Sequence, residues 1–516
     1  MHLHRETIGF FTVLAIACCL VLGVFASPVE AKTIVVTTFI DTAIPPFDAD
    51  GVCGTGTVSD LPTNGPVSLR EAIIAANNTP GEHTITFAPS LRGEIIVVNF
   101  DDLDADLTPD ALPALCRGHT RIEGHLDANG VPDITLDGDK LPVAAPAVAA
   151  AGILVLSSHN TINGLSVQHF PIGIQVRAGE FTTPGTVTHT TVTNNLVTES
   201  KIDGINVRTG NVPDSQVAHT TLSQNKVTNN TRFGIIVVAN LSGVGSYTQI
   251  AHTTITDNEV TENGNSGILM VSLGNGNLIS KAAITHNMVS SNSGIGIEVR
   301  GGYAGAKDNT LDVRIRGNRV ADNENRGIFM IAGQDSSSNN HIAARIEENT
   351  LERNQIFGIE AVAGNGAADF RTGISVNNEL GVRIKRNTVE SQTGVGILVA
   401  GGVGSSDGRD GAIANNNQTD AEVTQNTVED STGTGILLVA GAKRASANTL
   451  EVWVAHNAVC DNHPDIVGVS SPMPNPGTGN VLEGQIFQNT ATTVTVADGT
   501  SGNTAAVTQF KNDPCS

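Results

Sequence analysis

Five cationic side chains in the middle of the chain stand at related positions and are the strongest candidates for chemistry. Each precedes an asparagine of a repeated phrase by four or two residues; they are Arg314, Arg316, Arg345, Arg383 and Lys385. A guanidinium binds a carboxylate through two parallel hydrogen bonds, so these residues are candidates for binding a uronate-bearing polysaccharide. The alternative is that they pair with neighbouring acids such as Glu347 and Glu348 and only keep the surface soluble.

This cluster is informative because the chain as a whole is strongly acidic. Its 516 residues carry a formal net charge of −22. Such an excess of negative charge argues against nucleic acid and against an anionic membrane surface as partners. Aromatic residues make up only 3% of the chain, with a single Trp, so a continuous track of aromatics stacking on a glycan is not predicted.

A second candidate site is an acidic stretch near the N-terminus, "FDDLDADLTPD" at 100–110. Its carboxylates at Asp101, Asp102, Asp104 and Asp106 are weak candidates for holding Ca²⁺ through oxygen ligands. The spacing is not that of an EF-hand, and the alternative is a solvated acidic loop. The cofactor prediction is therefore Ca²⁺ at most.

The elements that position these residues repeat along the chain from about 158 to 470. One fixed point is an asparagine, at Asn163, Asn195, Asn225, Asn258, Asn287, Asn318, Asn349, Asn387, Asn426 and Asn457. The other is a glycine, at Gly173, Gly204, Gly234, Gly267, Gly296, Gly327, Gly358, Gly396, Gly435 and Gly468. From Asn195 to Asn426 the glycine always follows nine residues later, whereas the return to the next asparagine varies. A fixed segment alternating with a variable one is typical of a solenoid.

Short apolar segments surround these fixed points and predict strands. An aliphatic residue lies three before and two after each asparagine, as Ile315 and Val320 do around Asn318, and another follows each glycine, as Ile328 does. The segments are too short for helices and rich in β-branched residues. Stacked turns of this kind bury one continuous core, which predicts an all-β, parallel β-helix of about ten or more coils. The asparagine is expected at a bend, in a left-handed conformation, with its side chain in a ladder along the axis.

The phrase itself resembles a known family. "VRIRGNRVADNENRGIFMIAG" (313–333) is similar to the right-handed parallel β-helix repeats of the pectin-lyase-like superfamily. That resemblance implies a right-handed solenoid and leaves the function open among lyases, hydrolases, epimerases, adhesins and tailspikes. Lyases of this superfamily use Arg or Lys as a base, often with Ca²⁺, which makes Arg314, Arg345, Arg383 and Lys385 catalytic candidates. The Asn-Thr-Asp, Gly-His-Gly and Asp-Pro-His-Glu segments of related enzymes are missing.

The N-terminal part predicts export and a cap. Residues 1–31 read as a signal peptide, with an uncleaved anchor as the alternative, and no second apolar span follows. In the cap, "SLREAIIAANN" (68–78) predicts a short helix with Ser68 as N-cap and Glu71 completing a capping box. This segment resembles the CSLREA-type segment of secreted β-helices, except that Val67 stands where that motif has Cys. Arg70 and Glu71 are expected to be structural.

Four cysteines remain outside the signal segment. Their positions predict one disulfide at each end of the solenoid, Cys53–Cys116 and Cys460–Cys515. The predicted organisation is a signal at 1–31, a cap and first coils at 32–150, repeats at 151–470 and a C-terminal cap at 471–516. A monomer is expected.

Paired threonines mark the outward face of the earlier coils. Thr191 and Thr193 precede Asn195 by four and two residues, and Thr254 and Thr256 precede Asn258 in the same way. Thr suits exposed strands, although such rows also resemble an ice-binding face. The primary prediction is a secreted surface or binding module that contacts extracellular polysaccharide. The alternatives are a polysaccharide lyase acting on a uronate polymer and, more remotely, an adhesin or an ice-binding-like face.

Overall fold

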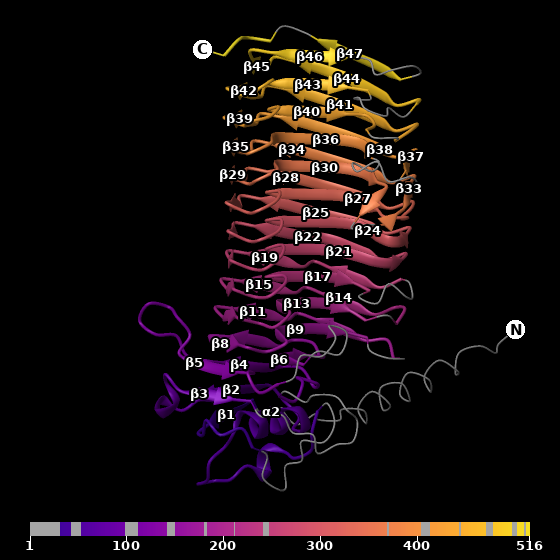
Figure 1. Cartoon of the computed structure of the whole chain (residues 1–516). Helices are drawn as coiled ribbons and strands as arrows, with labels where there is room; N and C mark the ends of the chain where they lie inside the picture. The colour runs from indigo at the N-terminus through magenta and orange to yellow at the C-terminus, as the bar shows by residue number, and fades with distance from the viewer. Residues whose placement is uncertain are drawn as a thin grey trace, which may run out of the picture.

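The chain forms a parallel β-helix whose coils stack along one axis, from the cap at one end to the C-terminus at the other (Figure 1). This computed structural model describes residues 31–42, 53–98, 112–141, 150–179, 183–210, 212–240, 247–368, 371–403, 413–442, 445–470, 478–497, 503–509 and 512–515. Within these ranges the strands form three long sheets, of 18, 13 and 12 strands, and two small pairs. The parallel β-helix predicted from the repeats is confirmed.

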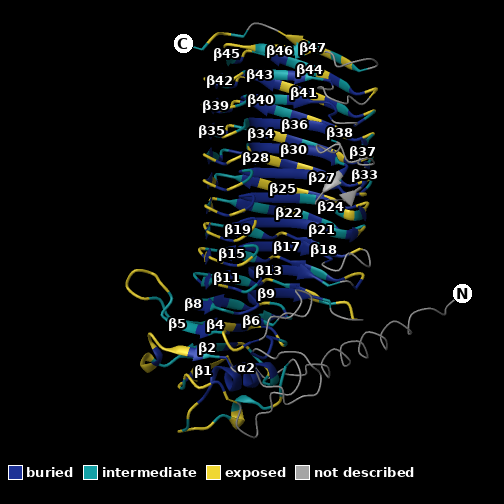
Figure 2. Ribbon diagram, viewed as in Figure 1, coloured by how far each residue is buried: buried dark blue, intermediate teal, exposed yellow. Residues whose placement is uncertain are grey.

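One coil shows how the phrase folds. Strand β25 (Thr310–Arg316) belongs to the 18-stranded sheet, β26 (Arg319–Ala321) to the 13-stranded sheet and β27 (Ile328–Gln334) to the 12-stranded sheet. Each strand pairs in parallel with its equivalent in the next coil. The aliphatic positions Ile315, Val320 and Ile328 are completely buried. These side chains form one core cluster that extends through the stack, and Figure 2 shows the buried strands coil after coil.

The outer face of the 12-stranded sheet is also buried, as its apolar sequence predicts. Phe329, Ile331 and Leu398 form one outer cluster, and Ile236 and Leu269 belong to another. A strand with apolar residues on both faces is normally covered on both sides. The strand alternation rule therefore applies to the 18-stranded sheet, where every second side chain reaches solvent, but not to this one.

The predicted asparagine ladder exists and runs farther than expected. The side-chain amide of each member donates to the side-chain oxygen of the next over 2.9 to 3.3 Å, from Asn195 through Asn457 and on to Asn489 and Asn512. Two more ladders were not predicted. One joins Asn230, Asn263, Asn292, Asn323, Asn354 and Gln392. The other runs from Asn277 through Asn309, Asn340, Asn378, Asn417 and Asn448 to Asn480.

Three details of the repeat prediction were wrong. Asn163 is outside the ladder because it pairs in register with Thr193, on the outward row of its strand. The left-handed conformation belongs to the residue before each ladder asparagine, for example Asn194 with φ 53°. Gly468 is not the last member of the glycine series, because Ile466 pairs with Ile436 and so places Asp465 opposite Gly435.

The cap follows the sequence prediction closely. Strands β1 (Lys32–Val36), β2 (His83–Phe87), β3 (Ile95–Val97), β4 (Thr120–Glu123) and β5 (Ile134–Asp137) form its first coils. Helix α2 spans Leu69–Asn78, and its N-cap residue, Ser68, forms the predicted capping box with Glu71. Arg70 pairs instead with Asp41, through nitrogen–oxygen distances of 2.9 and 2.8 Å, and both side chains are buried. Arg70 and Glu71 are therefore structural residues of the cap.

Each end of the stack is closed by a disulfide. Cys53 is bonded to Cys116 in the cap, and Cys460 is bonded to Cys515 at the C-terminal end. The two links close loops with sequence separations of 63 and 55. A disulfide stabilises a fold mainly by restricting the unfolded chain. A terminal coil has a neighbouring coil on only one side, and each disulfide lies at such an end.

Candidate functional site

The five predicted cations lie on three consecutive strands of the 18-stranded sheet. These strands are β25, β28 (His341–Glu347) and β34 (Glu379–Lys385). Arg314, Arg345 and Arg383 are in register and form one outward row, and Arg316, Glu347 and Lys385 form the row beside it. Because neighbouring strands lie about 4.8 Å apart, the side chains form one compact group. We call Arg314, Arg316, Arg345, Arg383 and Lys385 the cationic patch.

Several members of the cationic patch have acidic partners, as the alternative interpretation predicted. Arg314 contacts Glu347 at 3.2 Å and Arg316 contacts Glu348 at 2.6 Å. The hydrogen bond from Arg316, together with one from Arg386, lowers the pKa of Glu348 and keeps it charged.

Arg383 donates to Glu422 at 2.7 Å, across to the next strand, β38 (Gln418–Thr424). Within the part of the chain that the structure describes, Arg345 and Lys385 form no ion pair, and Arg345 is exposed. The central guanidinium of the patch is therefore open to a ligand.

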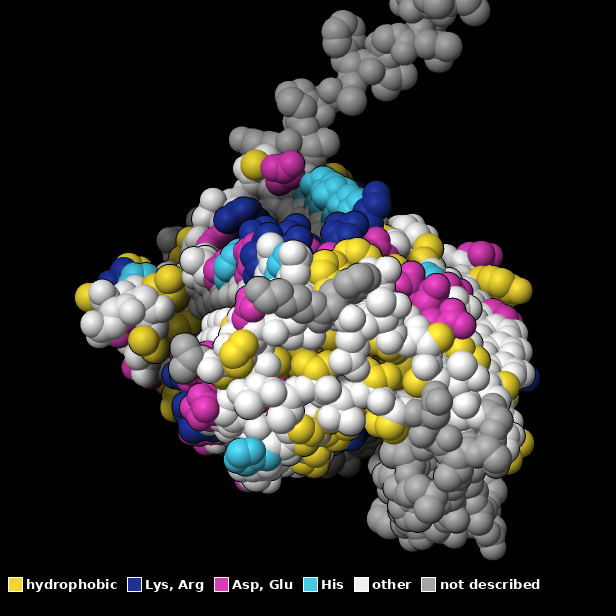
Figure 3. Space-filling view, turned by 90° about the horizontal axis from the view of Figure 1, so that it is seen from above, with side chains coloured by type: hydrophobic (Ala, Val, Ile, Leu, Met, Phe, Trp, Pro, Cys, Tyr) yellow, Lys and Arg dark blue, Asp and Glu magenta, His cyan; other side chains and the backbone are white. Residues whose placement is uncertain are grey.

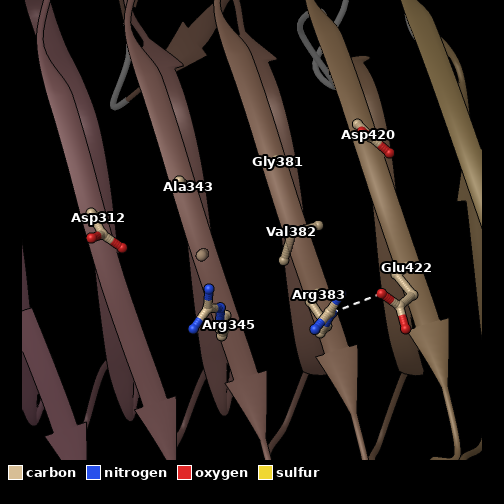
Figure 4. A pocket seen from close by; sticks show the side chains of 9 residues that line it. Asp312, Ala343, Arg345, Gly381, Val382, Arg383, Asp420 and Glu422 are labelled. Atoms are coloured by element: carbon tan, nitrogen blue, oxygen red, sulfur yellow. Dashed lines mark hydrogen bonds and ion pairs between the residues drawn. The ribbon is translucent and has the colours of Figure 1, made fainter. Parts of the chain in front are cut away.

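An open depression of about 310 Å³ lies beside Arg345. Its floor includes Ala343 and Gly381, whose small side chains leave room above the sheet (Figure 4). Arg345, Arg383 and Glu422 line one side, on neighbouring strands. The depression thus combines guanidinium donors with carboxylate acceptors over a flat floor.

Two further carboxylates stand on the outer strands of the depression. Asp312 and Asp420 are in the same outward row as Ala343 and Gly381, one strand beyond them on either side. A carboxylate accepts hydrogen bonds from hydroxyl groups, and a guanidinium donates to a carboxylate or a ring oxygen. This mixture is suited to a polyhydroxylated ligand that also carries a carboxylate.

The single tryptophan, Trp453, was set aside in the sequence analysis because aromatic residues are too few for a stacking track, but it belongs to the row of Arg345 and Arg383. Strand β41 (Thr449–Ala455) pairs with β38, and the register places Trp453 beside Glu422, which in turn pairs with Arg383. The indole is 46% exposed and is held edge-on against the Phe487 ring at 4.7 Å between centroids. The signal was present, because Trp453 precedes Asn457 by four residues, as Arg345 precedes Asn349.

The threonine rows lie on the same sheet in earlier coils. Strands β11 (Thr191–Thr193), β15 (Thr221–Ser223) and β19 (Thr254–Thr256) pair in the predicted register. Hydroxyl groups bond along one row, Ser223 to Thr193 at 3.0 Å and Thr285 to Thr256 at 3.1 Å. The second row, which contains Thr191, Thr221 and Thr254, ends where Ala283 pairs with Thr254. An ice-binding role for these rows stays a prediction.

The calcium prediction cannot be placed, since Asp101, Asp102, Asp104 and Asp106 lie outside the described residues. Among the residues that the structure does describe, no group of three or more His, Cys, Asp or Glu side chains is arranged to hold a metal ion. No helix in those ranges is long and apolar enough to cross a membrane.

Comparison with known proteins agrees with this architecture. A family model described as a right handed beta helix region matches residues 149–406, which is half of the chain. The chain belongs to the right-handed β-helix family. No curated protein matches its sequence.

Three of the solved structures to which this chain is similar are the following. The A-module of a mannuronan C-5 epimerase from Azotobacter vinelandii has 13% identity and a TM-score of 0.45, over 84% of this chain and 91% of that one. A tailspike protein of E. coli bacteriophage HK620 in complex with a hexasaccharide has 13% identity and a TM-score of 0.36, over 82% and 69%. A DFA-IIIase from Arthrobacter chlorophenolicus has 13% identity and a TM-score of 0.33, over 83% and 89%.

Proposed function

We propose that this protein is a secreted binding module whose 18-stranded sheet holds an acidic polysaccharide, centred on Arg345. The observation that carries the proposal is the state of this one side chain. Arg345 is exposed, stands between Arg314 and Arg383 in register, and forms no ion pair in the described part of the chain. Arg345 also lines the depression, so its N–H donors adjoin space that a ligand can occupy.

The chemistry of the depression supports a sugar acid as ligand. Ala343 and Gly381 leave space for a ring, Asp312 and Asp420 can accept hydrogen bonds from its hydroxyl groups, and Arg345 can donate hydrogen bonds to its carboxylate. Trp453, two strands beyond Arg383 in the same row, adds an aromatic face on which a neighbouring sugar can stack. Because the depression is open, a chain can lie across it and continue in both directions.

Secretion is part of the proposal. The apolar run within residues 1–31 is the proposed export signal, and the two disulfides are typical of chains that fold in an oxidising compartment. We further propose that residues 32–150 cap the stack, 151–470 provide the binding coils and 471–516 close it.

The proposal predicts that the double substitution Arg345→Gln and Arg383→Gln weakens binding to polygalacturonate at pH 8 at least about tenfold, since each charged hydrogen bond is worth about 1.5–3 kcal/mol. Titration calorimetry of the purified chain against polygalacturonate, alginate and neutral dextran gives the measurement. The matched control is Arg319→Gln with Arg353→Gln, two exposed arginines on or just beyond strands of the 13-stranded sheet that pair with Glu352 and Asp322. An equal loss in the control, or no loss in either, would refute the proposal.

The same samples decide the lyase alternative. A lyase would release an unsaturated product, which is followed by ultraviolet absorbance with and without Ca²⁺. Product that appears with the parent chain and disappears with Arg383→Gln would replace a binding module with an enzyme at the same face. Binding without product supports the proposal as stated.

A further inference from the structure

Five histidines form a continuous stack on the 18-stranded sheet. His119, His159, His189, His219 and His252 occupy equivalent positions in successive coils, and we call them the histidine file. Their ring centroids are 4.6 to 4.7 Å apart and neighbouring ring planes differ by only 3° to 11°. All five side chains are exposed.

The backbone explains the position of the histidine file but not its composition. Each member has a left-handed conformation, with φ between 52° and 62°. Histidine tolerates this region, yet so do other residues. The left-handed position five residues later in the same coils is filled by Gly164, Asn194, Gln224 and Asp257. Conformation alone therefore does not call for five consecutive imidazoles.

The ring nitrogens of the histidine file are largely free. Among the described residues, the one acid in contact is Glu82, whose carboxylate lies 3.8 Å from His119 at the start of the file. Arg117 and Arg121 flank His119 in the chain, and Arg121 is paired with Glu123. The neighbouring outward positions, such as Thr191, Thr221 and Gln216, are uncharged. In the described part of the chain, the imidazoles of His159, His189, His219 and His252 form no ion pair.

Two members of the histidine file, His159 and His219, have a pKa that the stack itself shifts. Partial desolvation, and then the charge on adjacent imidazoles, lower the pKa of His159 and of His219 below the usual value. The protonated forms of His159 and His219 are therefore less stable than that of an isolated histidine, and they become populated only when the solution is acidic. On protonation these imidazoles become cations on an exposed surface.

The line of the histidine file continues to the depression beside the cationic patch. Lys281 occupies the next left-handed position after His252, on β22 (Leu278–Thr285), with φ 52°. On the following strand, β25, Val313 pairs with Ala282, which places the carboxylate of Asp312 next along the line from Lys281, and Arg314 lies two residues farther along that strand. From β4 through β7 (Thr161–Asn163) to β34 there are eight strand steps, or about 38 Å at the usual spacing. Figure 3 shows imidazoles and Lys or Arg side chains gathered on the same side of the molecule.

We propose that the histidine file is an acid-activated extension of the glycan-binding face, on which protonated imidazoles bind carboxylates of the same acidic polysaccharide chain. This inference rests on the proposed function. At pH 8 the ligand contacts the cationic patch alone. At acidic pH the protonated histidine file extends the cationic surface along the axis beyond the cationic patch, so a long polyuronate gains contacts that a short one does not.

The test compares polygalacturonate affinity at pH 8 and pH 5.5 at one ionic strength. We expect the parent chain to bind at least about tenfold more tightly at pH 5.5, because charge-assisted contacts are added. The double variant His189→Gln and His219→Gln is expected to match the parent at pH 8 and to tighten less than about threefold on acidification. Gln224 already occupies a left-handed position, so the fold accepts glutamine there; melting temperatures verify this.

The control is His286→Gln, an exposed histidine with φ 56° outside the file, which should keep the full acid response. A double variant that tightens as much as the parent would overturn the inference. Loss of pH 8 binding in Arg345→Gln with Arg383→Gln tests the proposed function separately. If the parent binds only at pH 5.5 and the double histidine variant does not, the file binds independently and the proposed role of Arg345 fails.

Discussion

Replacing Asn318 with leucine is expected to lower the free energy of unfolding by about 5 kcal/mol, although the two side chains are similar in size. The amide of Asn318 donates to the Ile284 carbonyl at 2.8 Å and to Asn349 at 2.9 Å. Its oxygen accepts from the backbone and the side chain of Asn287, both at 2.9 Å. Leucine removes all four bonds and leaves the buried N–H of Asn287 without its partner.

Urea denaturation and thermal melting of the purified chain give the measurement. Gln418→Leu is the control, because this amide is exposed on β38 and a surface change of this kind costs less than about 0.5 kcal/mol. Since each coil is stabilised by its neighbours, the Asn318 substitution should also open the stack locally. Equal stability of the two variants would show that the ladder does not stabilise the coils.

Gly327→Ala is expected to destabilise the chain by about 3 kcal/mol, because the stacked glycines leave no room for a methyl group. A Cβ atom at Gly327 would lie 2.7 Å from the carbonyl oxygen of Gly358, 2.8 Å from Leu351 and 2.9 Å from Asn354. The carbonyl belongs to the backbone of the next coil and cannot move without disturbing the stack.

Gly381→Ala is the matched control for this prediction. It lies on an outward strand position where the nearest atom to a new Cβ would be the Ile342 oxygen, at 3.9 Å. Its stability should be unchanged within about 0.5 kcal/mol, because alanine fits an extended strand. Circular dichroism melts of both variants are compared. If both substitutions had the same effect, steric exclusion would not explain the glycine series.

The fold was predictable because one short phrase determines the coil. The interval from Asn318 to Gly327 fixes two corners, and the aliphatic positions between them fix which faces turn inward. The misplaced Asn163 and Gly468 lie at the two ends of the repeat region, where register is set by pairing with an atypical neighbour. The second ladder could have been found, since Asn323 follows Asn318 by five residues and Asn292 follows Asn287 likewise.

The sequence predicted which residues of the candidate site share a row, but not which of them form ion pairs. Counting back from each ladder asparagine places Arg314, Arg345 and Arg383 in one row. Whether an arginine is free depends on side-chain reach, because Arg383 is engaged by Glu422 one coil away whereas Arg345 is not. Trp453 was set aside because the chain has too few aromatic residues for a stacking track, and its place in the row follows only from the register.

The most direct test of the central claim is arginine footprinting with phenylglyoxal, with and without an oligogalacturonate ligand, read by mass spectrometry of peptides. We predict that the ligand slows modification of Arg345 severalfold and leaves Arg92 unchanged, an exposed arginine with no ion pair in the described part of the cap. Slowing at Arg345 alone would place the ligand on the 18-stranded sheet. Modification of Arg345 at the same rate with saturating ligand would contradict the proposed binding face.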